Sequence, residues 1–61
     1  MIYMFTHPKY KHISYTILAV GQDSYGQFVE YRTNTSNFIR KSNICDLEKW
    51  FLNEVDKFML N

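Results

Sequence analysis

The sequence contains very few of the residues that small proteins use for covalent or metal-based stabilisation. Cys45 is the only cysteine, so we expect no disulfide within the chain. The only histidines, His7 and His12, lie far from Cys45, and one cysteine with two histidines cannot complete a structural zinc site. We therefore expect neither a metal nor another cofactor. A chain of 61 residues must then rely on dense packing, or on association with another chain, for its stability.

Glycine, excess charge and long apolar runs are also scarce, and each absence argues against a class of function. Gly21 and Gly26 are the only glycines and bracket a turn, which leaves no glycine-rich loop for binding phosphate. The formal net charge is only +1, so the electrostatic argument for nucleic-acid binding is weak. The apolar segment 1–5 is too short for a secretion signal or a membrane span. These features predict a cytoplasmic protein without membrane attachment.

Aromatic and aliphatic residues are what the sequence has in abundance. Hydrophobic residues make up 46% of the chain and aromatic residues 18%, which favours a single packed domain over residues 1–61. A domain of this size buries only about 60% of the surface that its unfolded chain exposes. Eleven aromatic side chains exceed what one small core needs, so we expect several of them to lie at an interface.

A β-hairpin is the clearest structural pattern in the chain. Residues 12–20 are rich in β-branched and aromatic residues, and a turn-rich segment, 21–26, separates them from a second alternating run, 27–33. We expect these two strands to be joined by about four to six residues. The alternation assigns one set of side chains to the core face: Ile13, Tyr15, Ile17 and Ala19. The opposite face then carries His12, Thr16, Leu18, Val20, Phe28, Glu30 and Arg32.

Two shorter strands and one helix complete the predicted fold. Segments 2–6 and 37–41 read as short strands, and 44–59 reads as an amphipathic helix with Asn43 and Asp46 in a capping-box arrangement. Its apolar stripe consists of Ile44, Leu47, Phe51, Val55 and Phe58. The sequence therefore predicts a small α+β domain, in which a C-terminal helix covers part of one face of an antiparallel sheet of three to four strands.

The residue types needed for catalysis are present, but their spacing does not indicate an active site. Cys45 falls at the start of the predicted helix, where a thiol can be activated, yet we interpret it as a small, half-buried side chain. Neither His7 nor His12 has an identifiable catalytic partner. None of the six carboxylates shows the spacing of a pair that would share one pocket. We therefore predict that the protein is not an enzyme.

Binding to another protein agrees better with the surplus of aromatic residues. Tyrosine, tryptophan and arginine dominate the energetics of protein interfaces, and Tyr25 lies at a turn tip where a core role is difficult to arrange. The residues predicted to contact a partner are Tyr10, Tyr25, Tyr31, Arg32 and Arg40. A homodimer is a further expectation, either through an unpaired sheet edge or through Trp50 and Leu60. A structural subunit that assembles with its own copies is a weaker alternative.

A small nucleic-acid-binding regulator is the main alternative. Lysine and tyrosine interleave in segment 9–12, and exposed aromatic rings on a sheet can stack on bases while cations follow the phosphates. The residues assigned to this alternative are Lys9, Lys11, Arg40 and Lys41. The two hypotheses differ in their salt dependence, because counterion release makes nucleic-acid binding weaken steeply as salt increases.

The composition and one local resemblance point to a viral origin. Phenylalanine, tyrosine, methionine, isoleucine, asparagine and lysine are abundant, and their AT-rich codons indicate a gene of a phage or mobile element. Ser14-Tyr15 to Gln22-Asp23, Gly26-Gln27 and Glu30-Tyr31 resemble the hairpin of the phage-encoded uracil-DNA glycosylase inhibitors. The predicted C-terminal helix departs from that family, which ends in a strand. The order of strands followed by a helix is similar to that of some anti-CRISPR proteins.

These resemblances imply a small anti-defence protein that works by binding. We expect it to inhibit or redirect a host enzyme, with defence and DNA-processing enzymes as the candidate targets. The expected mechanism is occlusion, in which a rigid hairpin or sheet face presents aromatic anchors and one or two arginines to the target.

Overall fold

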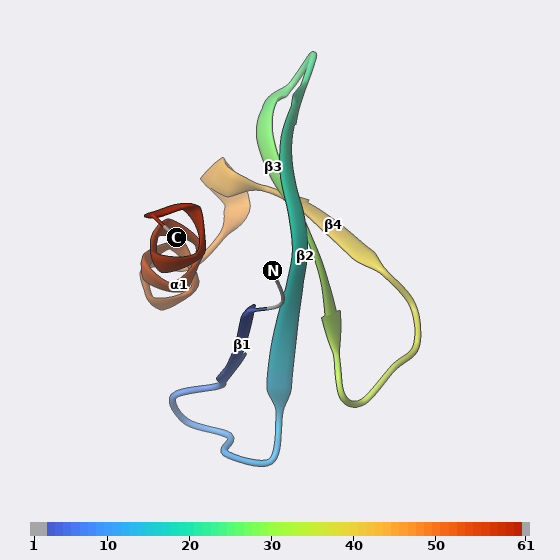
Figure 1. Cartoon of the computed structure of the whole chain (residues 1–61), viewed down its shortest axis with the longest axis vertical. Helices are drawn as coiled ribbons and strands as arrows, with labels where there is room; N and C mark the ends of the chain where they lie inside the picture. The colour runs from blue at the N-terminus through green and yellow to red at the C-terminus, as the bar shows by residue number, and fades with distance from the viewer. Residues whose placement is uncertain (1–2, 61) are drawn as a thin grey trace.

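Residues 3–60 are described by the computed structural model, and they form an antiparallel sheet with one helix against it (Figure 1). The strands lie in the sheet in chain order and are β1 (Tyr3–Thr6), β2 (Ser14–Asp23), β3 (Gly26–Thr33) and β4 (Arg40–Asn43). A short 3-10 helix, η1 (Ile44–Asp46), leads into the α-helix α1 (Lys49–Leu60). The predicted α+β class, an antiparallel sheet of three to four strands with a C-terminal helix, is therefore confirmed, and the sheet has four strands.

The strand boundaries differ from the predicted ones, because side chains in the connections set them. The predicted strand 2–6 corresponds to β1, and Ile2 lies outside the described residues. β2 starts two residues later than predicted, since the Asn34 side chain accepts a hydrogen bond from Ser14 N (3.0 Å) and donates one to His12 O (2.8 Å). The predicted short strand 37–41 is instead β4, which starts three residues later. It is preceded by a loop in which Phe38 N donates to Ser36 Oγ (3.1 Å).

The hairpin between β2 and β3 is tighter than predicted. Asp23 pairs with Gly26, so only Ser24 and Tyr25 connect the strands. Asp23 Oδ1 accepts a hydrogen bond from Tyr25 N (2.8 Å). Gly26 has a φ of 113°, a backbone conformation that residues other than glycine rarely adopt. The bond from Tyr25 N, followed by the contact with Lys41 Nζ at 3.2 Å, lowers the pKa of Asp23. An ionised aspartate therefore closes this turn.

A β-bulge in β2 changes which side chains face the helix. Ile17 pairs with Tyr31 and Ala19 pairs with Glu30, so Leu18 has no partner on β3. Beyond the bulge Val20 pairs with the fully buried Val29 and packs against the core, whereas Ala19 moves to the opposite face with Glu30. The predicted faces are correct up to Ile17 and wrong for Ala19 and Val20, because strict alternation holds only for a regular strand.

The α-helix begins five residues later than predicted. Asn43 makes no side-chain capping bond, because it is still part of β4 and pairs with Phe28. Ile44 to Asp46 form the separate turn η1, and Leu47 returns to an extended conformation before α1 starts at Lys49. The predicted capping box is therefore wrong. Three stripe positions remain in place, with Phe51 and Val55 buried and Phe58 packed against them.

The core lies between α1 and the sheet, and most of the partly buried side chains packed around its buried centre are aromatic. Its buried members are Ile17, Val29, Phe51 and Val55. The Phe51 ring is central, since its centroid lies 5.0–5.4 Å from four other aromatic rings, those of Phe5, Tyr15, Tyr31 and Trp50. Each such pair contributes about 0.5–1.5 kcal/mol beyond simple burial. Much of the expected aromatic surplus is thus used to join helix and sheet.

Strand β1 is held to α1 by a short chain of polar contacts. Tyr3 Oη donates a hydrogen bond to Glu54 Oε1 (2.8 Å), and Lys57 Nζ lies 3.2 Å from Glu54 Oε2. The bond to Glu54 raises the pKa of the Tyr3 phenol, because the bond requires the phenol proton and a phenolate would face the carboxylate. The hydrogen bond that Lys57 itself donates to Glu54 Oε2 raises the pKa of Lys57.

We expect the stability of the protein to decrease at alkaline pH, and Tyr3→Phe to reduce that decrease. The Tyr3 contribution is fully present below the unfolded pKa of about 10 and is lost as pH rises through the raised folded pKa. The free energy of unfolding, measured by urea denaturation between pH 8 and pH 11, tests this. Tyr25→Phe is the control, because that ring is 85% exposed. An equal alkaline loss in wild type and Tyr3→Phe would contradict the prediction.

Candidate functional site

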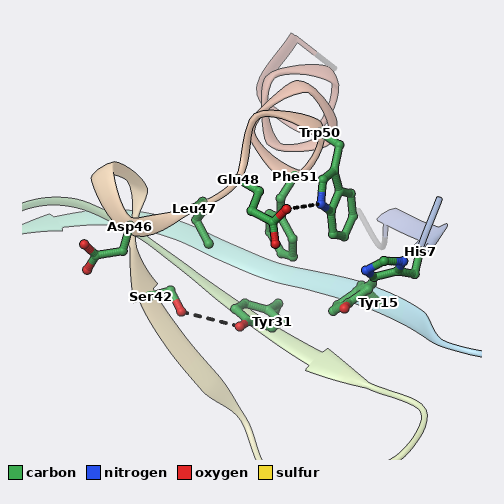
Figure 2. Close-up of a pocket in the computed structure, with 9 residues that line it drawn as sticks. All are labelled: His7, Tyr15, Tyr31, Ser42, Asp46, Leu47, Glu48, Trp50 and Phe51. Atoms are coloured by element: carbon green, nitrogen blue, oxygen red, sulfur yellow. Dashed lines mark hydrogen bonds between the residues drawn. The ribbon is translucent and has the colours of Figure 1, made fainter. Parts of the chain in front are cut away.

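The helix-facing side of the sheet is only partly covered, and a pocket of about 260 Å³ remains beside the start of α1 (Figure 2). Its lining comes from β2, β3, β4, the loop after β1 and the segment around the start of α1. The lining residues are His7, Tyr15, Tyr31, Ser42, Asp46, Leu47, Glu48, Trp50 and Phe51. A pocket assembled from so many segments exists only in the folded chain.

Tyr15 and Tyr31 form the sheet side of this pocket, and their rings are held in place. Their centroids are 6.0 Å apart, and the Phe51 ring meets each of them edge-on. Burial raises the pKa of Tyr15 above the ordinary phenol value, which favours the neutral phenol further. The Tyr31 Oη atom lies 3.4 Å from Ser42 Oγ on the neighbouring strand. The pocket therefore has a rigid aromatic floor with hydroxyl groups at its margin.

Trp50 and His7 form a second aromatic wall. Their ring centroids are 4.7 Å apart, and His7 Nδ1 accepts hydrogen bonds from Lys9 N (3.0 Å) and Tyr10 N (3.1 Å). Trp50 Nε1 donates a hydrogen bond to Glu48 Oε2 at 3.3 Å. Figure 2 shows that this bond turns the Glu48 carboxylate toward the aromatic rings. A negative charge thus lies at the N–H edge of the Trp50 ring, beside the pocket.

A second pocket of about 210 Å³ adjoins the first and shares Tyr15 and Tyr31 with it. Its other lining residues are Ile13, Thr33, Thr35 and Arg40. We call the two pockets together the aromatic groove. Its charge is divided, because Glu48 lies in the first pocket and Arg40 in the second. Both charges act on Tyr15, whose pKa Arg40 lowers and Glu48 raises, although burial has the larger effect.

The five residues predicted to contact a partner do not form one surface. Tyr31 and Arg40 line the aromatic groove. Tyr25 lies at the tip of the β2–β3 hairpin and Tyr10 in the β1–β2 loop, at opposite ends of the molecule (Figure 1). Arg32 pairs with Thr16 and points to the face away from the helix, since its neighbour Tyr31 faces the helix.

Three residues that line the groove were not among the predicted partner contacts. Tyr15 was predicted only as a core-face residue and Trp50 only as a dimer contact, and Glu48 was not among the predicted contacts. The sequence did indicate that part of the sheet face would stay uncovered, because a single helix covers only part of a sheet with this many strands. The residue at which the helix begins decides which aromatic side chains it leaves uncovered.

The cations assigned to nucleic-acid binding are also dispersed. Arg40 and Lys41 are consecutive on β4 and therefore point to opposite faces of the sheet. Lys41 Nζ lies 3.2 Å from Asp23 Oδ2 and 4.2 Å from the centroid of the Phe28 ring. Lys9 and Lys11 lie in the loop between β1 and β2, with Lys9 over the Tyr10 ring. These contacts leave no continuous basic surface across the four residues.

The surfaces proposed for a homodimer are separate from one another. β1 and β4 form the two edges of the sheet, and Leu60 at the end of α1 is 86% exposed. Trp50 lies in the first turn of α1 and Leu60 in the last, about 15 Å away along the helix. A contact through Trp50 would therefore involve the groove, whereas one through Leu60 would involve the opposite end of α1.

The chemically reactive groups are not gathered into one place. No cluster of three or more histidine, cysteine or acidic side chains suited to a metal occurs within residues 3–60. Cys45 lies in η1 and is exposed rather than half-buried as predicted, and its Sγ is 3.9 Å from Asp46 Oδ1. In the part of the chain that the structure describes, no helix is long and apolar enough to cross a membrane. That the protein is not an enzyme stays a prediction.

Comparison of the chain with protein-family models, with curated proteins and with solved structures finds no match. The resemblance of the hairpin to uracil-DNA glycosylase inhibitors therefore stays a prediction. Any assignment of function must be argued from the groove itself.

Proposed function

We propose that this protein is a small non-enzymatic binding protein that holds a segment of a partner protein in its aromatic groove and thereby occludes it. The observation that carries this proposal is the pair of adjoining pockets that share Tyr15 and Tyr31. Two pockets in a row suit successive side chains of one extended segment. Tyrosine, tryptophan and arginine supply most of the binding energy at protein interfaces, and the groove presents all three.

The distribution of charge favours a protein partner over nucleic acid. The Glu48 carboxylate lines the first pocket, where it would repel a phosphate backbone. Arg40 is the one cation among the lining residues of the two pockets. A polypeptide can satisfy both charges, because it can offer a cationic group at one end and an acidic group at the other.

The proposed partner is a bacterial enzyme, and the proposed setting is the cytoplasm of the host cell. The AT-rich residue usage of the chain supports a phage or mobile-element origin. For such a protein, occlusion of a defence or DNA-processing enzyme is the role that we propose. Because its sheet and helix share one aromatic core, the domain can present the groove with little loss of conformational freedom on binding.

Matched double variants test whether the groove is the contact surface. The groove variant Trp50→Ala/Arg40→Ala and the control Tyr25→Ala/Arg32→Ala each remove one aromatic ring and one arginine. Tagged proteins are used to capture partners from nuclease-treated bacterial lysate, and affinity is then measured with the captured enzyme. We expect the groove variant to bind at least about tenfold more weakly and the control within about twofold of wild type.

Circular dichroism of both variants ensures that only folded proteins are compared. If Trp50→Ala proves unfolded, Arg40→Ala alone carries the test, since Arg40 is exposed. Loss of binding in the control variant instead would place the contact at the hairpin tip or on the far sheet face. Capture that disappears after nuclease treatment would show that nucleic acid is the ligand.

A further inference from the structure

The first pocket of the aromatic groove has the chemistry of a site for a cationic side chain. The Glu48 carboxylate is held by Trp50 Nε1 through one oxygen, Oε2. A carboxylate has about four lone-pair positions, so this bond leaves it able to accept hydrogen bonds from a ligand. None of the residues that line this pocket is a lysine or arginine, so the Glu48 carboxylate gives it a negative charge. The first pocket is therefore a locally negative site.

Aromatic rings line the pocket beside this carboxylate. The Tyr15 ring lies 5.7 Å from that of Trp50, and His7 extends the same wall, as Figure 2 shows. The face of an aromatic ring carries partial negative charge and attracts cations that lie within about 6 Å of its centroid. The pocket thus combines a full negative charge with several partial ones around a single opening.

Further oxygen atoms line the same opening and favour one kind of cation. The Tyr31 hydroxyl and Ser42 Oγ lie 3.4 Å apart at the margin of the pocket, and Figure 2 shows them on the side opposite Trp50. A guanidinium group carries five N–H donors in one plane and stacks on aromatic rings, whereas an ammonium group is compact and strongly hydrated. Flat walls with several dispersed acceptors suit the planar group.

We propose that the first pocket binds the guanidinium group of an arginine side chain of the partner protein. This inference rests on the proposed function, because the arginine belongs to the segment held in the groove. Glu48 forms the ion pair, Trp50 and Tyr15 provide stacking surfaces, and Tyr31 and Ser42 accept further N–H groups. Arg40 in the second pocket is then positioned for an acidic residue of the same segment, which completes the charge complementarity.

Binding in this pocket can be followed by the intrinsic fluorescence of the protein. Trp50 is the only tryptophan, so intrinsic tryptophan fluorescence reports directly on the pocket. Wild-type protein is titrated at constant ionic strength with N-acetylarginine amide, N-acetyllysine amide and N-acetylnorleucine amide. We expect saturable binding of the arginine amide with a dissociation constant on the order of 1–10 mM, as suits so small a ligand. The lysine amide should bind at least about fivefold more weakly, and the norleucine amide should not saturate.

Two isosteric variants separate the charge of Glu48 from its structural role. Glu48→Gln keeps an oxygen acceptor for Trp50 Nε1 and removes only the negative charge, so arginine amide should bind about tenfold more weakly. Asp56→Asn makes the same charge change at an exposed position of α1 outside the groove, and its affinity should equal that of wild type. Equal weakening in both variants, or in neither, would overturn the assignment of Glu48.

A selection with displayed random 12-residue peptides distinguishes failure of this inference from failure of the proposed function. Peptides that bind wild type and not the Trp50→Ala/Arg40→Ala variant should be enriched in arginine, and the enrichment should be lost with Glu48→Gln as bait. Groove-dependent peptides without arginine would overturn the inference and leave the proposed function in place. The absence of groove-dependent peptides, together with no saturable binding of the arginine amide, would overturn both.

Discussion

Replacing Phe51 with alanine should remove most of the free energy of unfolding of the protein at 25 °C. The Phe51 side chain is 5% exposed and lies at the centre of the aromatic core, where it meets rings from β1, β2, β3 and α1. Removal of a buried phenylalanine side chain costs about 3–5 kcal/mol. A domain of this length has a net stability of only about 3–9 kcal/mol. The expected loss is therefore most of the free energy of unfolding.

Far-UV circular dichroism and urea denaturation measure this effect directly. Phe51→Leu keeps most of the apolar volume and should remain folded, with a loss of about 1–2 kcal/mol. Met59→Ala, which truncates an exposed side chain of the same helix, should change stability by less than about 0.5 kcal/mol. A cooperative Phe51→Ala transition within about 1 kcal/mol of wild type would show that the core does not depend on this ring.

Deleting Leu18 should be tolerated, whereas deleting Glu30 from the facing strand should unfold the protein. Leu18 is the unpaired residue of the bulge, so its loss leaves Ile17 and Val20 facing the core with Ala19 between them in regular alternation. Deleting Glu30 makes Val29 and Tyr31 consecutive, which forces one of them to the opposite face. The contrast is informative because the tolerated deletion removes the more hydrophobic residue.

The two deletions are compared by circular dichroism and by the midpoint of thermal unfolding. Leu18 is half-buried, so its deletion should cost no more than about 1–2 kcal/mol in lost apolar contact. The Glu30 deletion should show no cooperative transition. If both deletions unfold the protein, the bulge is required for the twist of the hairpin rather than being a removable insertion.

The buried centre of the fold was predictable because it follows local periodicity. Ile17 and Val29 lie on the predicted inward faces of their strands, and Phe51 and Val55 lie on the predicted helix stripe. Apolar residues at two-residue and 3.6-residue spacing must face inward whenever a sheet and a helix pack together. These positions did not depend on the exact strand boundaries.

The boundaries themselves were decided by contacts between distant residues. Asn43 and Asp46 match a local helix-capping pattern, yet Asn43 pairs with Phe28 on β3 and extends the sheet instead. The bulge at Leu18 was equally hidden, because leucine is compatible with either face of a strand at a half-buried position. In both places a tertiary contact outweighs the local preference, which is worth only about 1 kcal/mol.

Local patterns in the sequence were enough to predict the α+β class, the buried positions Ile17, Val29, Phe51 and Val55, and an excess of aromatic residues over one small core. Tyr31 and Arg40 were also identified as candidate contacts. Strand alternation also predicted that Arg32 lies on the other face of the sheet. That Tyr31 and Arg40 share a groove with Tyr15 and Trp50 is seen only in the folded protein. The physical reason is that periodicity assigns a side chain to a face, whereas the edge of the covering helix decides which part of that face remains open.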